Sequence, residues 1–569
     1  MERSSARRII PIAVLGTALL LLAACSSATP TPLPTATMPI PTPTQIPAPT
    51  PTAVVIPPPQ GSQGGSLTVA GTAEIPHQDV HQEVQEALTT LGPGLAYSRL
   101  LRLRSGEDLE QPHLLLECDL CESWELTDNL VYEFHLRPGV RWQNVEPVNG
   151  RRLVASDLAF SYERLRTPGW PNASLFSSVG AIEAPDDNTL LVELDIADAD
   201  AILSLADGHS KIVAPEVVAK YGDLKDSPVV GTGPWTWQET EVGAGTVFLR
   251  NPDYFEPDLP FLDELKVAVV RSDLGHGRPD PSVAAAYAAG LIDVASVSPE
   301  NWEAFRQASP SFESTVSRQS GSGMIMVMNS GAGALQNQVV RQAVFQAIDP
   351  WDYLDTVWEG QGFASVGIPV QRPDWLLERV ELRQNYFADP GRARLLLAGT
   401  GLSLPIDIEV TVQTGPSGGP NPKLEGKLRE DLQAVGFNPT LRPMNPQQFD
   451  ELVIGPAKEF QFAVGPVPPT STTNRFLFAL LHSDGKWNIA SHNDTGLNAL
   501  IEQQAAEFDS SRRQRRLNEI QHHVLDQAYL FSPVTASSRW VFTGDLRGFA
   551  PNTALSEYNY WSRVWLDRF

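Results

Sequence analysis

The sequence predicts a fold that mixes strands and helices, α/β or α+β, and that is divided into more than one lobe. The chain has 569 residues, of which 42% are apolar, and this is enough material for a large core. Strand-like and helix-like patterns follow one another without an internal repeat. From Gly65 to Phe569, no stretch rich in proline, glycine and serine marks a simple domain boundary. We therefore expect the chain to cross between lobes more than once.

Short segments predict individual elements in chain order. Two glycines precede a β-rich run at 67–70, which we expect to be the first strand. Apolar and polar residues alternate over 131–136, and an apolar run at 190–194 follows a turn, so both segments are predicted strands. Apolar residues at helical spacing predict a helix over 337–354 that ends near its Asp-Pro pair, and two helices over 497–529.

The N-terminus has the pattern of an export signal. A basic start, MERSSARR, precedes an apolar run at 9–24 that is shorter than the roughly 20 residues of a membrane-spanning helix. The run ends in LAAC (22–25), which resembles the lipobox of bacterial lipoproteins. That resemblance implies cleavage before Cys25 and acylation of this cysteine. An ordinary signal peptide followed by an incidental cysteine is the alternative.

The segment after Cys25 predicts a tether. It is rich in proline and threonine from 29 to 59, and proline fixes φ and removes amide donors, so the segment stays extended. We expect residues 1–24 to be a signal peptide and 25–64 to be a lipidated tether at the extracytoplasmic face of the membrane. The net charge of −25 repels phosphate groups, which argues against nucleic-acid partners and against membrane contact other than through the lipid anchor.

A series of short motifs continues along the exported part. In chain order these strand, turn and helix motifs are LTVA (67–70), CESWE (121–125), YEFHLRPGVRW (132–142), LVASDLAFSYER (153–164), GTGPW (231–235), RNPDY (250–254) and RQA with AID (341–349). Their order over 65–569 resembles that of the extracytoplasmic solute-binding proteins of ABC importers for peptides, nickel and oligosaccharides. Each motif alone is a weak pattern, and the shared order carries the resemblance.

The resemblance implies an α/β fold of the two-lobed periplasmic-binding-protein type, with mixed sheets flanked by helices and a ligand buried between the lobes. Lobe I would comprise 65–100, 212–322 and 536–569, with an extra subdomain inserted over 101–211. Lobe II would comprise 323–535. These boundaries come from the family and not from the pattern of this chain.

The resemblance also implies a function. The protein would be the membrane-anchored, monomeric substrate-binding component of an ABC import system, which closes around a peptide or oligosaccharide-like solute and delivers it to the permease subunits. No cofactor is expected. A ligand sensor for an extracytoplasmic signalling partner has the same sequence features and stays an alternative. An extracytoplasmic enzyme is the weaker alternative, because the sequence contains no H-E-x-x-H motif and no Walker loop.

The segment 460–483 contains no carboxylate. In peptide-binding members of the family, an aspartate in this region pairs with the α-amino group of the ligand, and a buried ammonium without a counter-charge costs several kcal/mol. Thr472 and Asn474 instead offer neutral donors and acceptors, and Arg475 offers a cation. We expect these three residues to bind the ligand, and an oligosaccharide and an unusual peptide stay equal alternatives. A plain surface turn is the other interpretation of this segment.

Four further residues are candidates for ligand contact. His77 and Gln78 follow the first predicted strand, in a loop that lines the cleft in the family; a metal site there is the less favoured alternative. Trp358 and Trp487 fall in the predicted lobe II, and their faces could stack on a solute. Their alternative role is packing in the core.

Cys118 and Cys121 are separated by two residues. In an exported chain this spacing favours a local disulfide. A zinc site, a redox-active pair and free thiols are the alternatives, and we expect a structural role and no metal.

Overall fold

The computed structural model describes residues 61–568 except 72, 110, 128–129, 239–244, 271–280, 299–300, 310, 319–321, 369–371, 415–420, 469 and 471. These residues belong to one compact unit, 48–569. The predicted signal peptide, Cys25 and nearly all of the predicted tether lie outside the described residues. Within the described ranges, no helix is both long enough and apolar enough to cross a membrane.

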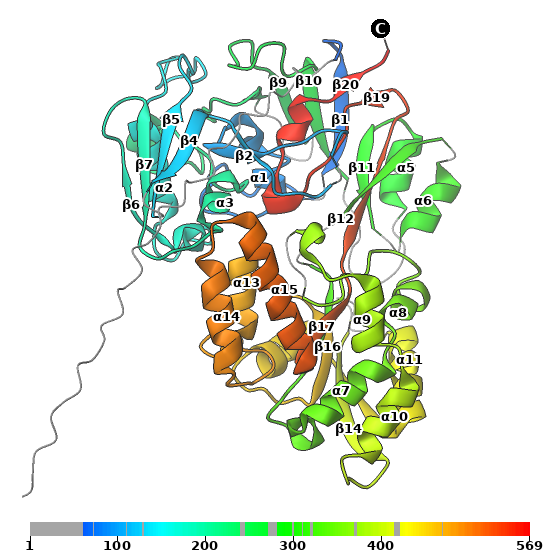
Figure 1. Ribbon diagram of the computed structural model, residues 1–569. Coiled ribbons are helices and arrows are strands. Elements are labelled where there is room, and N and C mark those ends of the chain that lie inside the picture. Colours follow the sequence, from blue (N-terminus) through cyan, green and yellow to red (C-terminus); the bar gives the residue numbers. More distant parts are fainter. Residues whose placement is uncertain are drawn as a thin grey trace, which may run out of the picture. The chain divides into compact units, whose positions relative to one another are not determined.

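The first large element is a mixed seven-stranded sheet with the order β12-β18-β11-β1-β10-β9-β8 (Figure 1). Its strands are β1 (Ser66–Gly71), β8 (Trp235–Gln238), β9 (Thr246–Arg250), β10 (Glu264–Val269), β11 (Val294–Val297), β12 (Glu313–Arg318) and β18 (Ser537–Phe542). The predicted first strand is confirmed as β1, which pairs in parallel with both β10 and β11. Helices α5 (Ser282–Ala288) and α6 (Trp302–Ala308) pack beside β11.

An antiparallel four-stranded sheet, β4-β5-β7-β6, lies between β1 and β8 in the chain. Its strands are β4 (Cys121–Thr127), β5 (Val131–Leu136), β6 (Val179–Glu183) and β7 (Thr189–Leu194). The alternation that predicted β5 and β7 is real, since every second side chain of each strand is buried. The elements that accompany this sheet are α1 (Glu86–Thr89), β2 (Leu101–Leu103), β3 (Leu116–Cys118), α2 (Ala155–Leu165), α3 (Ala201–Ala206) and α4 (Pro215–Tyr221).

A third, five-stranded sheet has the order β15-β14-β16-β13-β17. Its strands are β13 (Met324–Met328), β14 (Ile406–Gln413), β15 (Phe437–Met444), β16 (Phe462–Pro466) and β17 (Leu530–Val534). Both faces of this sheet are buried: Met326 and Met328 of β13 belong to one apolar core, and Ile325 and Val327 belong to the other. This explains why β13 is a continuous apolar run without alternation.

Helices cover both faces of the five-stranded sheet. They are α7 (Gln338–Ala347), α8 (Pro350–Thr356), α9 (Arg379–Asn385), α10 (Pro390–Ala398), α11 (Pro422–Val435), α12 (Pro446–Phe449), α13 (Thr473–Leu481), α14 (Thr495–Ala505) and α15 (Ser510–Asp526). The two helices predicted over 497–529 are confirmed as α14 and α15. The helix predicted over 337–354 is two helices, because Ile348 is extended and Asp349 starts a new helix by accepting a hydrogen bond from the backbone N–H of Trp351 (3.2 Å).

The chain passes between the seven-stranded and the five-stranded sheet twice. It leaves the seven-stranded sheet after β12 and enters the five-stranded sheet at β13, and it returns from β17 to β18 across 535–536, where the connection is visible in red (Figure 1). We use lobe I for the seven-stranded sheet together with the four-stranded inserted subdomain, and lobe II for the five-stranded sheet with its helices. After β18 the chain ends in lobe I with β19 (Leu546–Arg547) and β20 (Trp565–Leu566).

Candidate functional site

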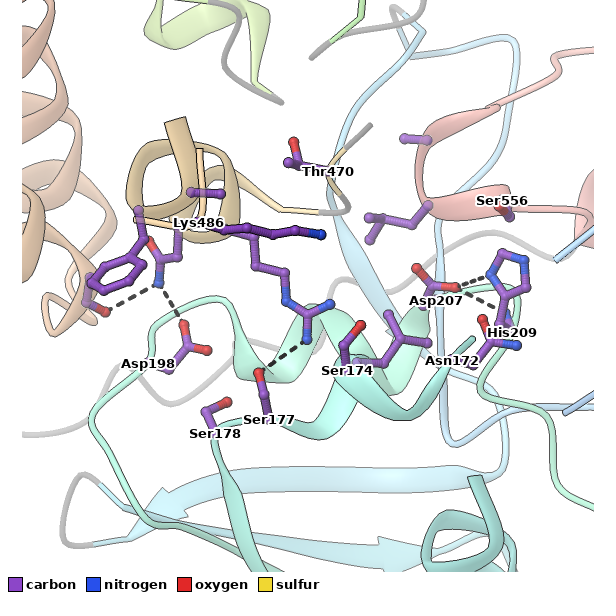
Figure 2. A pocket seen from close by; sticks show the side chains of 18 of the residues that line it. Asn172, Ser174, Ser177, Ser178, Asp198, Asp207, His209, Thr470, Lys486 and Ser556 are labelled. Atoms are coloured by element: carbon purple, nitrogen blue, oxygen red, sulfur yellow. Dashed lines mark hydrogen bonds and ion pairs between the residues drawn. The ribbon is translucent and has the colours of Figure 1, made fainter. Parts of the chain in front are cut away.

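A cavity of about 1310 Å³ lies between the two lobes. Lobe I lines it with Val84 and with residues of 171–178, 196–198, 207–209 and 553–556, and lobe II lines it with residues of 467–487 and 501–505. Arg318 and Ser322, near the first connection between the lobes, also line it. Figure 2 shows Ser177, Ser178 and Asp198 on one wall and Thr470 and Lys486 opposite them. A solute in this cavity would therefore contact both lobes at once.

Helix α13 supplies part of the lobe II wall because it is amphipathic. The side chain of Thr472 caps the helix by accepting a hydrogen bond from the backbone N–H of Arg475 (3.4 Å). Its buried face consists of Phe476, Leu477, Leu480 and Leu481, which pack into the core of lobe II. The remaining face presents Arg475, Phe478 and Ala479 to the cavity.

Three of the residues predicted to bind ligand line this cavity: Asn474, Arg475 and Trp487. Thr472 does not line it and is buried at the start of α13. Its role in the structure is the helix cap, which orients Arg475.

The other predicted contacts lie elsewhere among the described residues. The ring of His77 accepts a hydrogen bond from the backbone N–H of Asp79 (3.1 Å), and the backbone N–H of Gln78 donates to the carbonyl of Lys225 (3.0 Å). Trp358 packs against the core of lobe II. None of these three predicted residues lines the cavity between the lobes.

The side-chain amide of Asn474 is fully used by neighbouring protein groups. Its Nδ2 donates to Oδ1 of Asp198 (2.5 Å) and to the carbonyl of Ala505 (3.4 Å). Its Oδ1 accepts from Nε2 of Gln504 (2.8 Å) and from Nη2 of Arg513 (2.8 Å). An amide can make about four hydrogen bonds, so this side chain positions the cavity wall and has no bond left for a solute.

Two cations of lobe II reach the cavity beside Trp487. The guanidinium of Arg475 donates to the hydroxyl of Ser177 (3.4 Å), and burial lowers its pKa, while the charges of Asp198 and Asp207 act in the opposite direction. The ammonium of Lys486 lies 5.4 Å from the centre of the Trp487 ring. These groups could hold an anionic part of a solute.

Carboxylates also line the cavity, and they come from segments outside the predicted binding residues. Asp198 and Asp207 come from the inserted subdomain, and Glu502 comes from α14. The segment 460–483 is free of acid, as its sequence shows, but the site as a whole is not. The counter-charge that the segment 460–483 does not supply is therefore present on other segments of the cavity lining.

A model of the bacterial extracellular solute-binding proteins, family 5 (middle region), matches residues 116–488. The chain belongs to this family. The predicted family and the predicted two-lobed α/β fold are thereby confirmed. As a family 5 solute-binding protein, it works on the extracytoplasmic side of the membrane.

Curated relatives of this family 5 protein carry names of peptide-binding proteins. The "Probable di/tripeptide-binding protein 5" of Pseudomonas aeruginosa (strain UCBPP-PA14) is 26% identical over 531 residues, which cover 87% of this chain and 94% of the relative. The "Dipeptide-binding protein" of Escherichia coli (strain K12) is 23% identical over 343 residues, which cover 55% of this chain and 59% of the relative.

Solved structures share the fold of this family 5 protein. The ABC transporter substrate-binding protein CtaP from Listeria monocytogenes superposes with a TM-score of 0.73 at 18% identity, over 89% of this chain and 100% of that one. HbpA2 from Haemophilus parasuis gives a TM-score of 0.74 at 20% identity, over 88% of this chain and 100% of that one.

In the family 5 protein, the lobe I wall of the cavity is held by a buried ion pair at the C-terminal segment. Glu557 accepts two hydrogen bonds from Nη2 of Arg99, to Oε1 at 2.7 Å and to Oε2 at 2.9 Å, and it accepts a third from the backbone N–H of Leu103 (2.8 Å). Burial acts most strongly and would raise the pKa of Glu557, but the charge of Arg99 and the hydrogen bonds from Arg99 and from backbone N–H groups together outweigh burial, and the pKa lies below its usual value. The ion pair between Glu557 and Arg99 thus fixes the segment 553–556, which directly precedes Glu557.

A disulfide between two cysteines three positions apart adjoins the same buried ion pair. It joins Cys118 at the end of β3 to Cys121 at the start of β4, with an S–S distance of 2.01 Å. The carboxylate of Asp119, between the cysteines, accepts hydrogen bonds from the backbone N–H of Arg99 (2.8 Å) and from Nη1 of Arg102 (3.2 Å). The turn therefore carries one end of the buried ionic network. Among the described residues, no cluster of three or more histidine, cysteine or acidic side chains could hold a metal.

Proposed function

We propose that this protein captures peptides in the cavity between its lobes and delivers them, as a monomer, to the permease of an ABC importer. The observation that carries the proposal is the charge of the cavity wall. Groups of both signs line it: the cations are Arg318, Arg475 and Lys486, and the carboxylates are Asp198, Asp207 and Glu502. A peptide with free ends carries one charge of each sign, and a neutral oligosaccharide carries none.

The size of the cavity and the names of the relatives support a peptide. At about 1310 Å³ the cavity exceeds the range of roughly 300–1,000 Å³ that is usual for small-molecule pockets. Relatives named for di- and tripeptides cover most or about half of this chain. One related structure, DppA from Helicobacter pylori, was solved with the peptide STSA. A tripeptide or a somewhat longer peptide suits the space.

A thermal-shift comparison tests the proposal. The purified protein is heated with a pool of tripeptides and, separately, with a pool of neutral oligosaccharides. A ligand that binds only the native state adds about 2.7 kcal/mol of stability at a hundred times its Kd, which raises the melting temperature by several degrees. We expect this shift with the peptides. A shift with the oligosaccharides alone would overturn the proposal.

We propose the lobe boundaries that the family implies. Lobe I would comprise 65–100, 212–322 and 536–569 with the subdomain 101–211, and lobe II would comprise 323–535. Support comes from the sheets, because the chain leaves the seven-stranded sheet after β12 and re-enters it at β18.

We also propose that the solute leaves the protein chemically unchanged. One segment, GPSGG at 415–419, has the G-x-S-x-G spacing of a serine nucleophile motif, and it lies outside the described residues. A single short pattern of this kind is a weak signal. Mass spectrometry of a peptide after long incubation tests the point: we expect intact peptide. Cleavage that disappears in Ser417→Ala would show an enzyme.

Anchoring through Cys25 is a further part of the proposal. Its support is the LAAC sequence at 22–25 and the extended tract behind it. The full chain, produced in a bacterial host fed with an alkyne-labelled fatty acid, should become labelled and should fractionate with membranes. Cys25→Ser should abolish both. Label that persists in this variant would contradict acylation at this cysteine.

A further inference from the structure

We propose that Asp207 binds the α-ammonium of the peptide, so that the inserted subdomain of lobe I, and not lobe II, supplies the counter-charge. The inference rests on the proposed function, because it names the group that recognises the positive end of the solute. It also predicts the direction in which a peptide lies, with its N-terminus toward lobe I.

The side chain of Asp207 is buried, and only one of its two carboxylate oxygens accepts hydrogen bonds from the described residues of the protein. Its side chain is 5% exposed, and Oδ1 accepts two hydrogen bonds from His209, from the backbone N–H (2.9 Å) and from Nδ1 of the ring (2.7 Å). Among the described residues, Oδ2 has no hydrogen-bond partner, and it points away from His209 (Figure 2). A carboxylate oxygen that reaches a cavity wall without a protein donor is available to a solute, and an ammonium group is a donor with the matching charge.

The backbone around Asp207 holds this geometry in place. The backbone N–H of Gly208 donates to the carbonyl of Leu555 (2.7 Å), and a Cβ on Gly208 would lie 2.0 Å from the carbonyl oxygen of Ser556. Leu555 and Ser556 both have positive φ, 49° and 55°, which is costly for residues with a side chain. The next residue in sequence is Glu557, and its buried ion pair with Arg99 fixes this segment. The carboxylate is therefore held rigidly before a solute arrives.

The other carboxylates that line the cavity are less buried than Asp207. Asp198 is only partly buried; its Oδ1 accepts from Asn474 (2.5 Å) and from the backbone N–H of Asp200 (3.0 Å), and its Oδ2, like that of Asp207, has no hydrogen-bond partner among the described residues. The side chain of Glu502 is 65% exposed, so water screens its charge, and it lies 3.2 Å from Nε2 of His482. Of the acids that line the cavity, Asp207 combines deep burial with an oxygen that is open to a solute.

The experiment uses a peptide whose only ammonium is the α-amino group. A pool of tripeptides built from alanine, serine, leucine and phenylalanine is incubated with the wild-type protein, and the retained peptide is identified by mass spectrometry. Isothermal titration then gives the Kd of this peptide and of its N-acetylated form. Both are measured on the wild type, on Asp207→Asn and on the matched control Glu502→Gln, which removes one negative charge from the same cavity.

We expect the wild type to bind the free peptide about 10- to 100-fold more tightly than the acetylated one, the range of a charge-assisted hydrogen bond. Asp207→Asn keeps an oxygen for His209 and should bind both forms with nearly equal, weak affinity. Glu502→Gln should keep the wild-type discrimination. Circular dichroism and the melting temperature of each variant without ligand report folding.

Each other outcome has a definite meaning. If Asp207→Asn still prefers the free peptide, or weakens both forms by the same factor, Asp207 does not bind the ammonium and the inference is wrong, while the proposed function stands. If Glu502→Gln loses the discrimination as well, the general charge of the cavity acts in place of Asp207. If no peptide of the pool binds the wild type, both the proposed function and the inference fail.

Discussion

Arg513 of α15 and Asp200 at the start of α3 form a buried ion pair that joins lobe II to the inserted subdomain of lobe I. Nη1 of Arg513 lies 2.7 Å from Oδ1 of Asp200, and the two side chains are 8% and 3% exposed. Oδ2 of Asp200 accepts a hydrogen bond from the backbone N–H of Asn474 (2.8 Å). The carboxylate is thus paired on both oxygens, next to the cavity that Asn474 lines.

Removing the arginine should be costly. Arg513→Met leaves the buried carboxylate of Asp200 without its counter-charge, and we expect the free energy of unfolding to fall by about 3–5 kcal/mol. Arg516→Met is the matched control, because Arg516 lies on the same helix, is 34% exposed and pairs loosely with Glu507 (3.6 Å), so its loss should cost less than about 1 kcal/mol. Urea denaturation measures both. Equal losses would contradict the role given to the buried pair.

Gly208 should not tolerate a side chain. The Cβ of Gly208→Ala would overlap the carbonyl oxygen of Ser556, and relieving the clash should cost about 1–3 kcal/mol of unfolding free energy and weaken peptide binding. Gly426→Ala is the control. Gly426 lies within α11 with no atom within 4 Å of the added methyl group, so this change should stabilise the protein by about 0.5–1 kcal/mol. The idea fails if both variants unfold at the same denaturant concentration.

Buried His492 should make the stability of the protein depend on pH. Burial lowers its pKa to about 4, and its ring stacks on Tyr529 with 4.5 Å between the ring centres. Because the folded-state pKa lies below the unfolded value of about 6.5, this contribution is complete above pH 6.5 and is lost as the pH falls toward 4.

The variant His492→Phe keeps an aromatic ring and removes the titration. Between pH 7 and pH 4.5, the wild type should lose about 2 kcal/mol more unfolding free energy than this variant, measured by urea denaturation at each pH. His135→Gln, at a side chain that is 50% exposed, should follow the wild type. Parallel curves for the wild type and His492→Phe would show that His492 has no part in the acid sensitivity.

Counting free thiols tests the disulfide between Cys118 and Cys121. The chain has three, so Cys25→Ser leaves only Cys118 and Cys121. Thiol titration of this variant in denaturant should find no free thiol before reduction and two afterwards, because the two sulfurs are bonded. A further change, Cys118→Ser, should give one thiol under both conditions. Two thiols before reduction would mean that the pair is open in solution.

Local pattern predicted much of the fold. Strands β5 and β7 followed from alternation, and the helix end at Ile348 followed from the Asp-Pro pair, because these signals lie within a few residues. The site was predicted only in part. Arg475 was predicted from the polar segment 460–483 and Trp487 from its aromatic ring, whereas Asp207 belongs to a distant segment that only tertiary packing brings to the same cavity.

Two kinds of sequence signal predicted residues that lie outside the cavity or whose polar groups are already bonded to the protein. Trp358 was a candidate because aromatic rings stack on solutes, but packing in a core is the commoner use of such rings, and that is where it lies. Thr472 and Asn474 were candidates because of their polar groups. In the structure the hydroxyl of Thr472 caps a helix, and the amide of Asn474 makes four hydrogen bonds to protein groups. Residue type alone does not show which polar groups remain available.

Lobe II contains neither end of the described chain. Strand β1 and the final pair β19–β20 both belong to lobe I, and the chain enters lobe II after β12 and leaves it after β17. A mechanical force applied to either terminus, by a tether or by a fused reporter protein, therefore acts on lobe I first. Lobe II receives that load through its two chain connections and through its contacts with the inserted subdomain, so the Arg513–Asp200 pair carries part of the tension that reaches the wall with Arg475 and Lys486.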